Sequence, residues 1–115
     1  MHELSIAVNL VEIADQAASN AGLARVTTVH LRLGQLSGVV ADALLFGYDI
    51  ATQDTRLEGS RLEIQETPVI VFCSQCQVDY PLPDLQRFRC PACGDPAVFV
   101  TAGKEIELVS IEGEE

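Results

Sequence analysis

Four cysteines form two pairs, each with two residues between its members. The pairs are Cys73 with Cys76 and Cys90 with Cys93, and thirteen residues separate them. Two such turns can direct four thiolates at one ion, in the tetrahedral arrangement that zinc prefers. The spacing therefore predicts a structural Zn(2+) site, and four protein ligands leave no open position for catalysis on that ion.

A redox pair and a reactive thiol are the alternatives for these cysteines. A redox Cys-x-x-Cys site normally stands alone on a strand-to-helix turn, whereas this chain has two pairs. A reducing cytosol also favours a bound metal over disulfides. We expect the zinc to fold a segment of about 35 residues, which is below the size that usually folds unaided.

The chain begins Met1-His2-Glu3, and this terminus offers a second set of metal donors. The terminal amine, the backbone nitrogen between residues 1 and 2, and the imidazole of His2 can lie in one plane. A fourth donor from Glu3 or elsewhere would complete the square-planar site that suits Ni(II) or Cu(II). The alternative is an exposed histidine on a disordered tail, since termini are the least ordered parts of most domains. A helix directly behind Glu3 favours the chelate, because it tethers the terminus.

Hydrophobic periodicity predicts the elements that must position these donors. Apolar residues recur at three- and four-residue spacing over residues 4–21 and 41–51, which indicates amphipathic helices. Alternating patterns predict strands near residues 25–36, 61–66 and 104–111.

This order of elements predicts an α+β fold, with two helices packed on a three-stranded sheet and an inserted zinc-ribbon-like module. Residues 1-66 and 104-115 would form one domain, and residues 67-103 would form the zinc-binding module. We expect residues 112–115 to be a solvated tail and His30 to be a surface residue. The expected source of the module's small hydrophobic cluster is its aromatic residues, Phe72, Tyr80, Phe88 and Phe99.

The formal net charge is -10, from 17 acidic and 7 basic residues. This balance repels the phosphate backbone of nucleic acids, so we expect no nucleic-acid partner. Acidity fits basic protein partners or cations, although it also keeps many globular proteins soluble. We find no membrane span and no secretion signal, and therefore expect a cytoplasmic protein. We recognise no catalytic residue set, which argues against an enzyme.

The combination of motifs resembles the HypA/HybF family of hydrogenase maturation proteins, which are nickel metallochaperones. The opening Met1-His2-Glu3-Leu4-Ser5 is similar to the family's first motif, and Leu33-Gly34-Gln35-Leu36-Ser37-Gly38 is similar to its strand-end motif. The two Cys-x-x-Cys pairs match its zinc module in place and spacing. The resemblance covers nearly the whole chain.

The resemblance implies transported, exchangeable Ni(2+), bound through the Met1 amine, the backbone and imidazole of His2, and the Glu3 region. The nickel would be delivered to the large subunit of a [NiFe]-hydrogenase with help from a HypB-like GTPase. Some family members also serve urease maturation. Many relatives carry an acidic residue where this chain has Val40, and Glu where it has Gln35, so the donors at the terminus must do more of the coordination here.

Two other functions compete with this interpretation. A zinc-ribbon adaptor would bind protein or RNA and use its N-terminus only for packing. A thiol-disulfide enzyme would carry no zinc and would cycle its cysteines between oxidation states. Metal analysis separates the three, because they predict zinc with bindable nickel, zinc alone, and neither metal.

Overall fold

The computed structural model describes residues 2–96 and 98–115, which form two compact units. Unit 1 comprises Met1–Arg32, Val39–Gln65 and Glu107–Glu115, and unit 2 comprises Leu33–Gly38 and Glu66–Ile106. The boundaries expected from the sequence placed residues 33–38, residue 66 and residues 104–106 with the first domain, whereas in the structure they belong to the cysteine-bearing unit.

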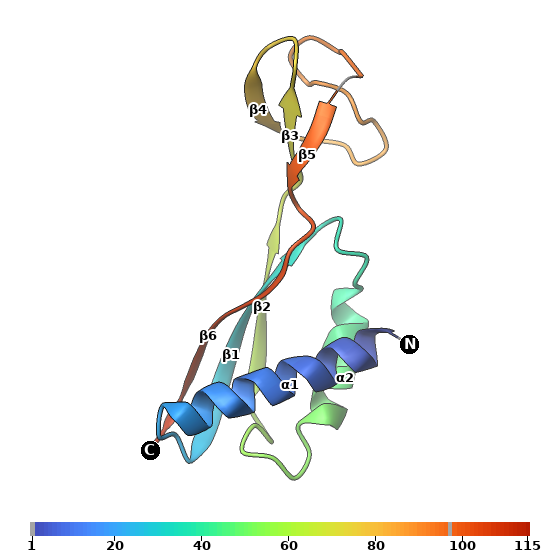
Figure 1. Ribbon diagram of the computed structural model, residues 1–115. Coiled ribbons are helices and arrows are strands. Elements are labelled where there is room, and N and C mark those ends of the chain that lie inside the picture. The colour runs from blue at the N-terminus through green and yellow to red at the C-terminus, as the bar shows by residue number, and fades with distance from the viewer. Residues whose placement is uncertain (1, 97) are drawn as a thin grey trace. The chain divides into compact units, whose positions relative to one another are not determined.

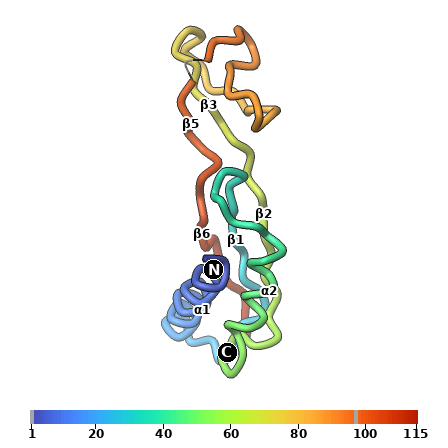
Figure 2. Tube along the Cα trace, turned by 90° about the vertical axis from the view of Figure 1, so that its right-hand side faces the viewer, coloured from blue at the N-terminus to red at the C-terminus, as the bar shows by residue number. Residues whose placement is uncertain are grey.

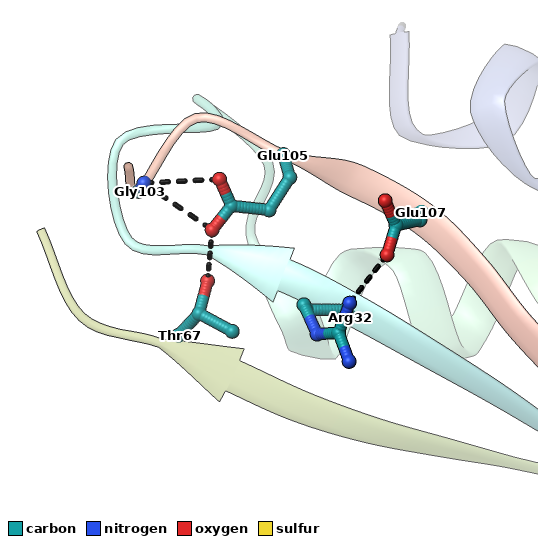
Figure 3. Close-up of polar contacts among 5 residues, drawn as sticks. All are labelled: Arg32, Thr67, Gly103, Glu105 and Glu107. Carbon is teal, nitrogen blue, oxygen red and sulfur yellow. Dashed lines mark hydrogen bonds and ion pairs between the residues drawn. The ribbon is translucent and has the colours of Figure 1, made fainter. Parts of the chain in front are cut away.

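Within the described residues, helices α1 (His2–Asn20) and α2 (Ala41–Ala51) accompany a sheet of β1 (Arg25–Gly34), β2 (Arg61–Thr67) and β6 (Ile106–Glu114). The strand order is β2-β1-β6. β1 and β2 run parallel, and β6 runs against β1 (Figures 1 and 3). Parallel neighbours need a long crossover connection, and α2 provides it. The predicted α+β arrangement is confirmed.

One core joins the two helices of unit 1 to one face of the sheet. Its buried members are Ala7, Leu10, Val11, Ala14, Ala18, Val26, Val29, Leu31, Leu44, Tyr48, Leu57 and Leu62. Ile13 and Leu45 fall within the apolar patterns of the helices, yet they are 57% and 38% exposed. Among the described residues, neither helix combines the length and the apolar character needed to cross a membrane.

The two helices pack directly against each other, and they lie side by side in both views (Figures 1 and 2). Gly47 of α2 makes this contact close: a Cβ atom there would lie 3.4 Å from both the Ala7 Cβ and the Leu4 Cα. Glycine suits a site where one backbone approaches another. The first turn of α1 is therefore held against α2.

The expectation of a solvated tail after Ile111 is wrong. β6 continues to Glu114, and the Ala24 N–H donates to the Glu114 carbonyl over 2.8 Å. The Glu112 carbonyl accepts a hydrogen bond from Thr27, and its carboxylate contacts His30. The end of β6 thus lies beside the end of α1 (Figure 1). Acidic composition indicated a tail because the pairing partner is about 85 residues earlier in the chain, outside any local pattern.

Unit 2 is built on a second antiparallel sheet, in the order β4-β3-β5. Its strands are β3 (Ile70–Cys73), β4 (Val78–Pro81) and β5 (Val98–Ala102), and β3 and β5 lie side by side in Figure 2. Cys73 is the last residue of β3 and Cys76 lies in the turn between β3 and β4, whereas the second pair lies in the segment that leads to β5.

Aliphatic residues, not the predicted aromatic ones, form the core of unit 2. The cluster consists of Val69, Val71 and Leu82, with Leu36, Val98 and Val100 packed against it. Phe99 is 63% exposed and Phe88 is 40% exposed. Phe72 and Phe99 are partners in the register of β3 and β5. They cannot share the face of Val71, because neighbouring residues of a strand point to opposite faces.

Glu105 connects residues 67 and 103, the two ends of the segment that contains the cysteines (Figure 3). Its carboxylate accepts a hydrogen bond from the Thr67 hydroxyl over 2.6 Å, and bonds from the Gly103 N–H at 3.0 and 3.2 Å. The bond from Thr67, followed by that from Gly103, lowers the pKa of Glu105 below its ordinary value. In unit 1, Glu107 forms an ion pair with Arg32, which connects β6 to β1.

Gly113→Ala tests the pairing of the C-terminal strand. An added Cβ would lie 2.2 Å from the Arg25 carbonyl oxygen, so the strands must shift. We expect unit 1 to lose about 1–3 kcal/mol of unfolding free energy, the usual cost of overpacking. Urea unfolding followed by circular dichroism measures the loss, with Glu115→Ala at the exposed chain end as the control. Equal stability of the two variants would mean that residues 112–115 are a tail.

Glu105→Gln tests whether the Glu105 carboxylate stabilises unit 2 through its bonds to Thr67 and Gly103. Because the folded-state pKa of Glu105 is lowered, its stabilisation is present at neutral pH and disappears as the pH falls below about 4.5. The glutamine variant cannot lose a charge, so its melting temperature should fall less between pH 6 and pH 3. Thermal melts across this range give the comparison, with Glu115→Gln as the control. Parallel pH profiles for Glu105→Gln and the unaltered chain would contradict the role of this carboxylate.

Candidate metal centres

The two Cys-x-x-Cys turns share one backbone geometry. The N–H of Gln77 donates to the Cys73 carbonyl over 2.7 Å, and the N–H of Gly94 donates to the Cys90 carbonyl over 2.8 Å. Both donors have a left-handed backbone, with φ of 59° at Gln77 and 77° at Gly94. Glycine adopts this conformation freely, whereas Gln77 adopts it because the turn demands it. The two pairs are therefore held in equivalent turns.

The four cysteine sulfurs converge as the spacing predicted. The Sγ atoms of Cys73 and Cys93 are 3.6 Å apart, those of Cys76 and Cys90 are 3.9 Å apart, and all four lie within 4.8 Å of one another. Zinc with Zn–S bonds of about 2.3 Å places tetrahedral sulfurs about 3.8 Å apart. The Cys73–Cys93 and Cys76–Cys90 distances therefore match those of a tetrahedral zinc site.

Backbone N–H groups stabilise negative charge on two of these sulfurs. The N–H of Cys76 donates to the Cys73 sulfur, and that of Cys93 donates to the Cys90 sulfur, each over 3.4 Å. Such bonds strengthen when the acceptor is ionised, so they favour the thiolates that a metal requires. Cys73 and Cys90 are buried, and water does not compete for these bonds.

Without a metal, the pKa values of the Cys76 and Cys90 thiols differ widely. The pKa of Cys76 rises to about 12, chiefly because its proton is held in a hydrogen bond with Cys93, and also because burial disfavours the thiolate. Burial likewise opposes ionisation of Cys90, but N–H groups of Cys93 and Ala92 outweigh it and lower the pKa of Cys90 to about 7. Metal binding must therefore expel protons, and its affinity should fall as the pH falls.

Of the predicted donors at the N-terminus, His2 and Glu3 lie in the first turn of α1. Met1 lies outside the described residues, and the helix begins at His2, two residues before the predicted start. The His2 Nε2 atom is 3.6 Å from the Glu3 carboxylate. The first N–H groups of a helix have no carbonyl partner in the helix, so the ladder does not use the His2 backbone nitrogen.

Val40 supplies an unexpected partner to Glu3. Its backbone N–H, at the N-terminus of α2, donates to Glu3 Oε2 over 3.4 Å. This bond is the main reason that the pKa of Glu3 is lowered, so its carboxylate is protonated at a lower pH than an ordinary glutamate. Position 40, where we expected an acidic side chain from the resemblance, thus orients the Glu3 carboxylate through the backbone N–H of Val40. Every residue except proline has a backbone N–H, so the residue types gave no signal for this bond and the sequence analysis did not predict it.

The helix N-terminus also sets an electrostatic condition on any ion bound there. The partial positive charge at that end disfavours a cation, and the carboxylate of Glu3 offsets it. His30 takes no part in this site, because its imidazole contacts Glu112. Among the described residues, the cysteine cage alone gathers three or more side chains of the types that bind metals.

Comparison with known proteins finds relatives that match nearly the whole chain. A family model described as HypA, hydrogenase/urease nickel incorporation, metallochaperone, matches residues 1–113. The hydrogenase maturation factor HypA of Roseiflexus sp. (strain RS-1) is 60% identical over 115 residues, which are 100% of this chain and 94% of that protein. That of Chloroflexus aurantiacus (strain ATCC 29366 / DSM 635 / J-10-fl) is 51% identical over 112 residues, 97% of this chain and 98% of the relative.

Two solved structures share the fold. The solution structure of the Ni metallochaperone HypA from Helicobacter pylori matches with a TM-score of 0.69 and 19% identity, over 97% of each chain. A solution structure of a HypA protein matches with a TM-score of 0.73 and 21% identity, over 98% of this chain and 96% of the other.

Cys73→Ser tests the four-sulfur cage. We expect it to lower the affinity for zinc by more than about 100-fold, because loss of a ligand should exceed the cost of losing a supporting hydrogen bond. Elemental analysis after dialysis at neutral pH measures retention, and acidification should release the metal from the unaltered chain. Gln75→Ala, an exposed change in the same turn, is the control. Full retention by Cys73→Ser would exclude the cage as the binding site.

Proposed function

Because the chain belongs to the HypA family of hydrogenase/urease nickel-incorporation metallochaperones, which are not enzymes, we propose that it carries Ni(2+) at its N-terminus. The cargo is delivered to the large subunit of a [NiFe]-hydrogenase. A resident Zn(2+) ion, held by the four cysteines, folds unit 2 and does not take part in delivery.

The observation that carries the nickel site is the juxtaposition of His2 and a charged Glu3 in the first turn of α1. The proposed donors are the Met1 amine, the backbone nitrogen and imidazole of His2, and the Glu3 region. The His2 Nε2 atom lies 3.6 Å from the Glu3 carboxylate, so the two side chains are neighbours. A chelate with the His2 backbone nitrogen would use the other ring nitrogen, Nδ1, and needs the exposed ring to turn. These nitrogen and oxygen donors suit Ni(II) better than the thiolate cage does.

The different exchange behaviour of the two sites follows from their surroundings. The His2 side chain is 61% exposed, so an acceptor can replace the terminal donors one at a time. Two of the four cysteines are buried, and all four ligand positions of their ion would be filled by protein. Nickel is therefore exchangeable and zinc is permanent. Free thiols at this spacing also favour a reducing compartment, and we propose a cytoplasmic location.

The proposed partners follow from the family. A HypB-like GTPase assists the transfer, and the hydrogenase large subunit receives the ion. The family description also includes urease, so urease maturation proteins are further candidate partners.

His2→Ala tests nickel binding at the terminus, with His30→Ala as the matched histidine control. We expect His2→Ala to lower nickel affinity by more than about tenfold, because it removes one donor of a small set. Isothermal titration of zinc-loaded protein with a native terminus measures the affinity. A peptide tag before Met1 should have the same effect, since it turns the amine into an amide. Acid should also weaken binding, as protons compete for nitrogen donors.

Equal nickel affinity in His2→Ala, His30→Ala and the unaltered chain would rule out the terminal site. Zinc without any bindable nickel would favour the adaptor function instead.

A further inference from the structure

The helical layer of unit 1 carries acidic side chains and no basic ones. Residues 1–24 and 39–55 contain no Lys or Arg. Their acidic residues are Glu3, Glu12, Asp15, Asp42, Asp49 and Asp54. Asp15 is neutralised by Arg56 at 2.8 Å. Asp42 and Asp49 enter none of the ion pairs that the described residues form, so the surface of α2 holds uncompensated negative charge.

An apolar hollow of about 120 Å³ lies between α2 and the first turn of α1. It is lined by Glu3, Leu4, Ala43, Phe46, Gly47 and Ile50. Phe46 is 71% exposed and Ile50 is 45% exposed, although both are large hydrophobic residues. An apolar cavity of about 150 Å³ can hold a benzene ring, so this hollow has the size for one apolar side chain.

The acidic and apolar features occupy one stripe of α2. Phe46 lies four residues after Asp42, and Asp49 and Ile50 lie three and four residues after Phe46, so the four side chains fall on one side of a helix. Aromatic residues at the centre of an interface contribute most of the binding energy, and complementary charges at the rim speed association and select the partner. The stripe therefore fits a segment with one apolar side chain between Lys or Arg residues.

We propose that this stripe, Asp42 to Ile50 with the hollow beside it, is the docking surface for such a basic protein segment of the partner that exchanges nickel with the chain. The inference rests on the proposed function for the identity of that partner. Its physical basis is the shared residue Glu3, which lines the hollow and lies 3.6 Å from the His2 imidazole.

Docking of the partner at this surface would also lower the affinity of the N-terminus for nickel. A Lys or Arg of the partner beside Glu3 competes for its carboxylate and places a positive charge near the ion. Both effects weaken cation binding at the terminus. The same contact that brings the partner close would therefore favour transfer of the ion over its retention.

Phe46→Ser tests the apolar anchor, with Ile13→Ser as a matched control. Ile13 is 57% exposed on α1, about 15 Å along the helix axis from Glu3, so its replacement removes a comparable apolar group elsewhere. The probes are the purified maturation GTPase and the purified precursor of the hydrogenase large subunit from the same organism. We expect at least one to bind the unaltered chain, and to bind Phe46→Ser about tenfold or more weakly.

Asp42→Lys/Asp49→Lys tests the acidic rim, with Glu12→Lys/Glu115→Lys as a control of equal charge change. The first double variant should slow association and weaken binding, and the second should not. Rising salt should weaken binding to the unaltered chain, because it screens the exposed charges. Circular dichroism checks that every variant is folded.

Nickel titration of Phe46→Ser separates this proposal from the nickel site. Unchanged nickel affinity with lost docking supports the docking surface. If His2→Ala leaves nickel affinity unaltered while Phe46→Ser still abolishes docking, the proposed nickel site fails and the surface stands. The docking proposal is overturned if neither probe binds the unaltered chain, or if both bind Phe46→Ser and Asp42→Lys/Asp49→Lys as tightly as the unaltered chain.

Discussion

The parallel pairing of β1 and β2 is the constraint from which the arrangement of unit 1 follows. Parallel neighbours cannot be joined by a tight hairpin, so the chain must leave the sheet and return, and α2 is that connection. Its core-facing side must then share the buried face of the sheet with α1. Gly47 allows the two helices to approach closely, and the N-terminus of α2 reaches Glu3 as a result. A topological requirement of the sheet thus determines the surroundings of the chain terminus.

The two candidate metal centres illustrate opposite solutions to metal binding. The cysteine cage is built from two equivalent turns whose N–H groups support thiolate charge, and it gathers four sulfurs around one point. The N-terminal site has few donors, and His2 is exposed. Burial and complete ligation favour retention, whereas exposure and incomplete ligation favour exchange. A metallochaperone that also held a structural ion would need both behaviours within one short chain.

The distribution of acidic residues over the surface gives information that the net charge of the chain does not. A net charge of -10 argues against nucleic-acid binding, but it says nothing about where a partner would dock. The helical layer concentrates acidic residues around an exposed phenylalanine, and Glu3 connects that surface with the proposed nickel donors. Phe46 and Ile50 are both exposed and both line the hollow beside Glu3, so the apolar surface there is contiguous.

Local pattern in the sequence determined the spacing of the four converging cysteines, the choice of His2 and Glu3 as candidate donors, the bounds of α2 and the alternation of β1. These features follow from residues a few positions apart, where helical and strand periods act directly. The left-handed turn at Gln77, the donation from Val40 to Glu3, the pairing of Glu112 with His30 and the aliphatic core around Val71 were decided by the tertiary structure. Each depends on segments brought together by the fold, or on backbone groups that every residue carries, so residue types in sequence order cannot reveal it.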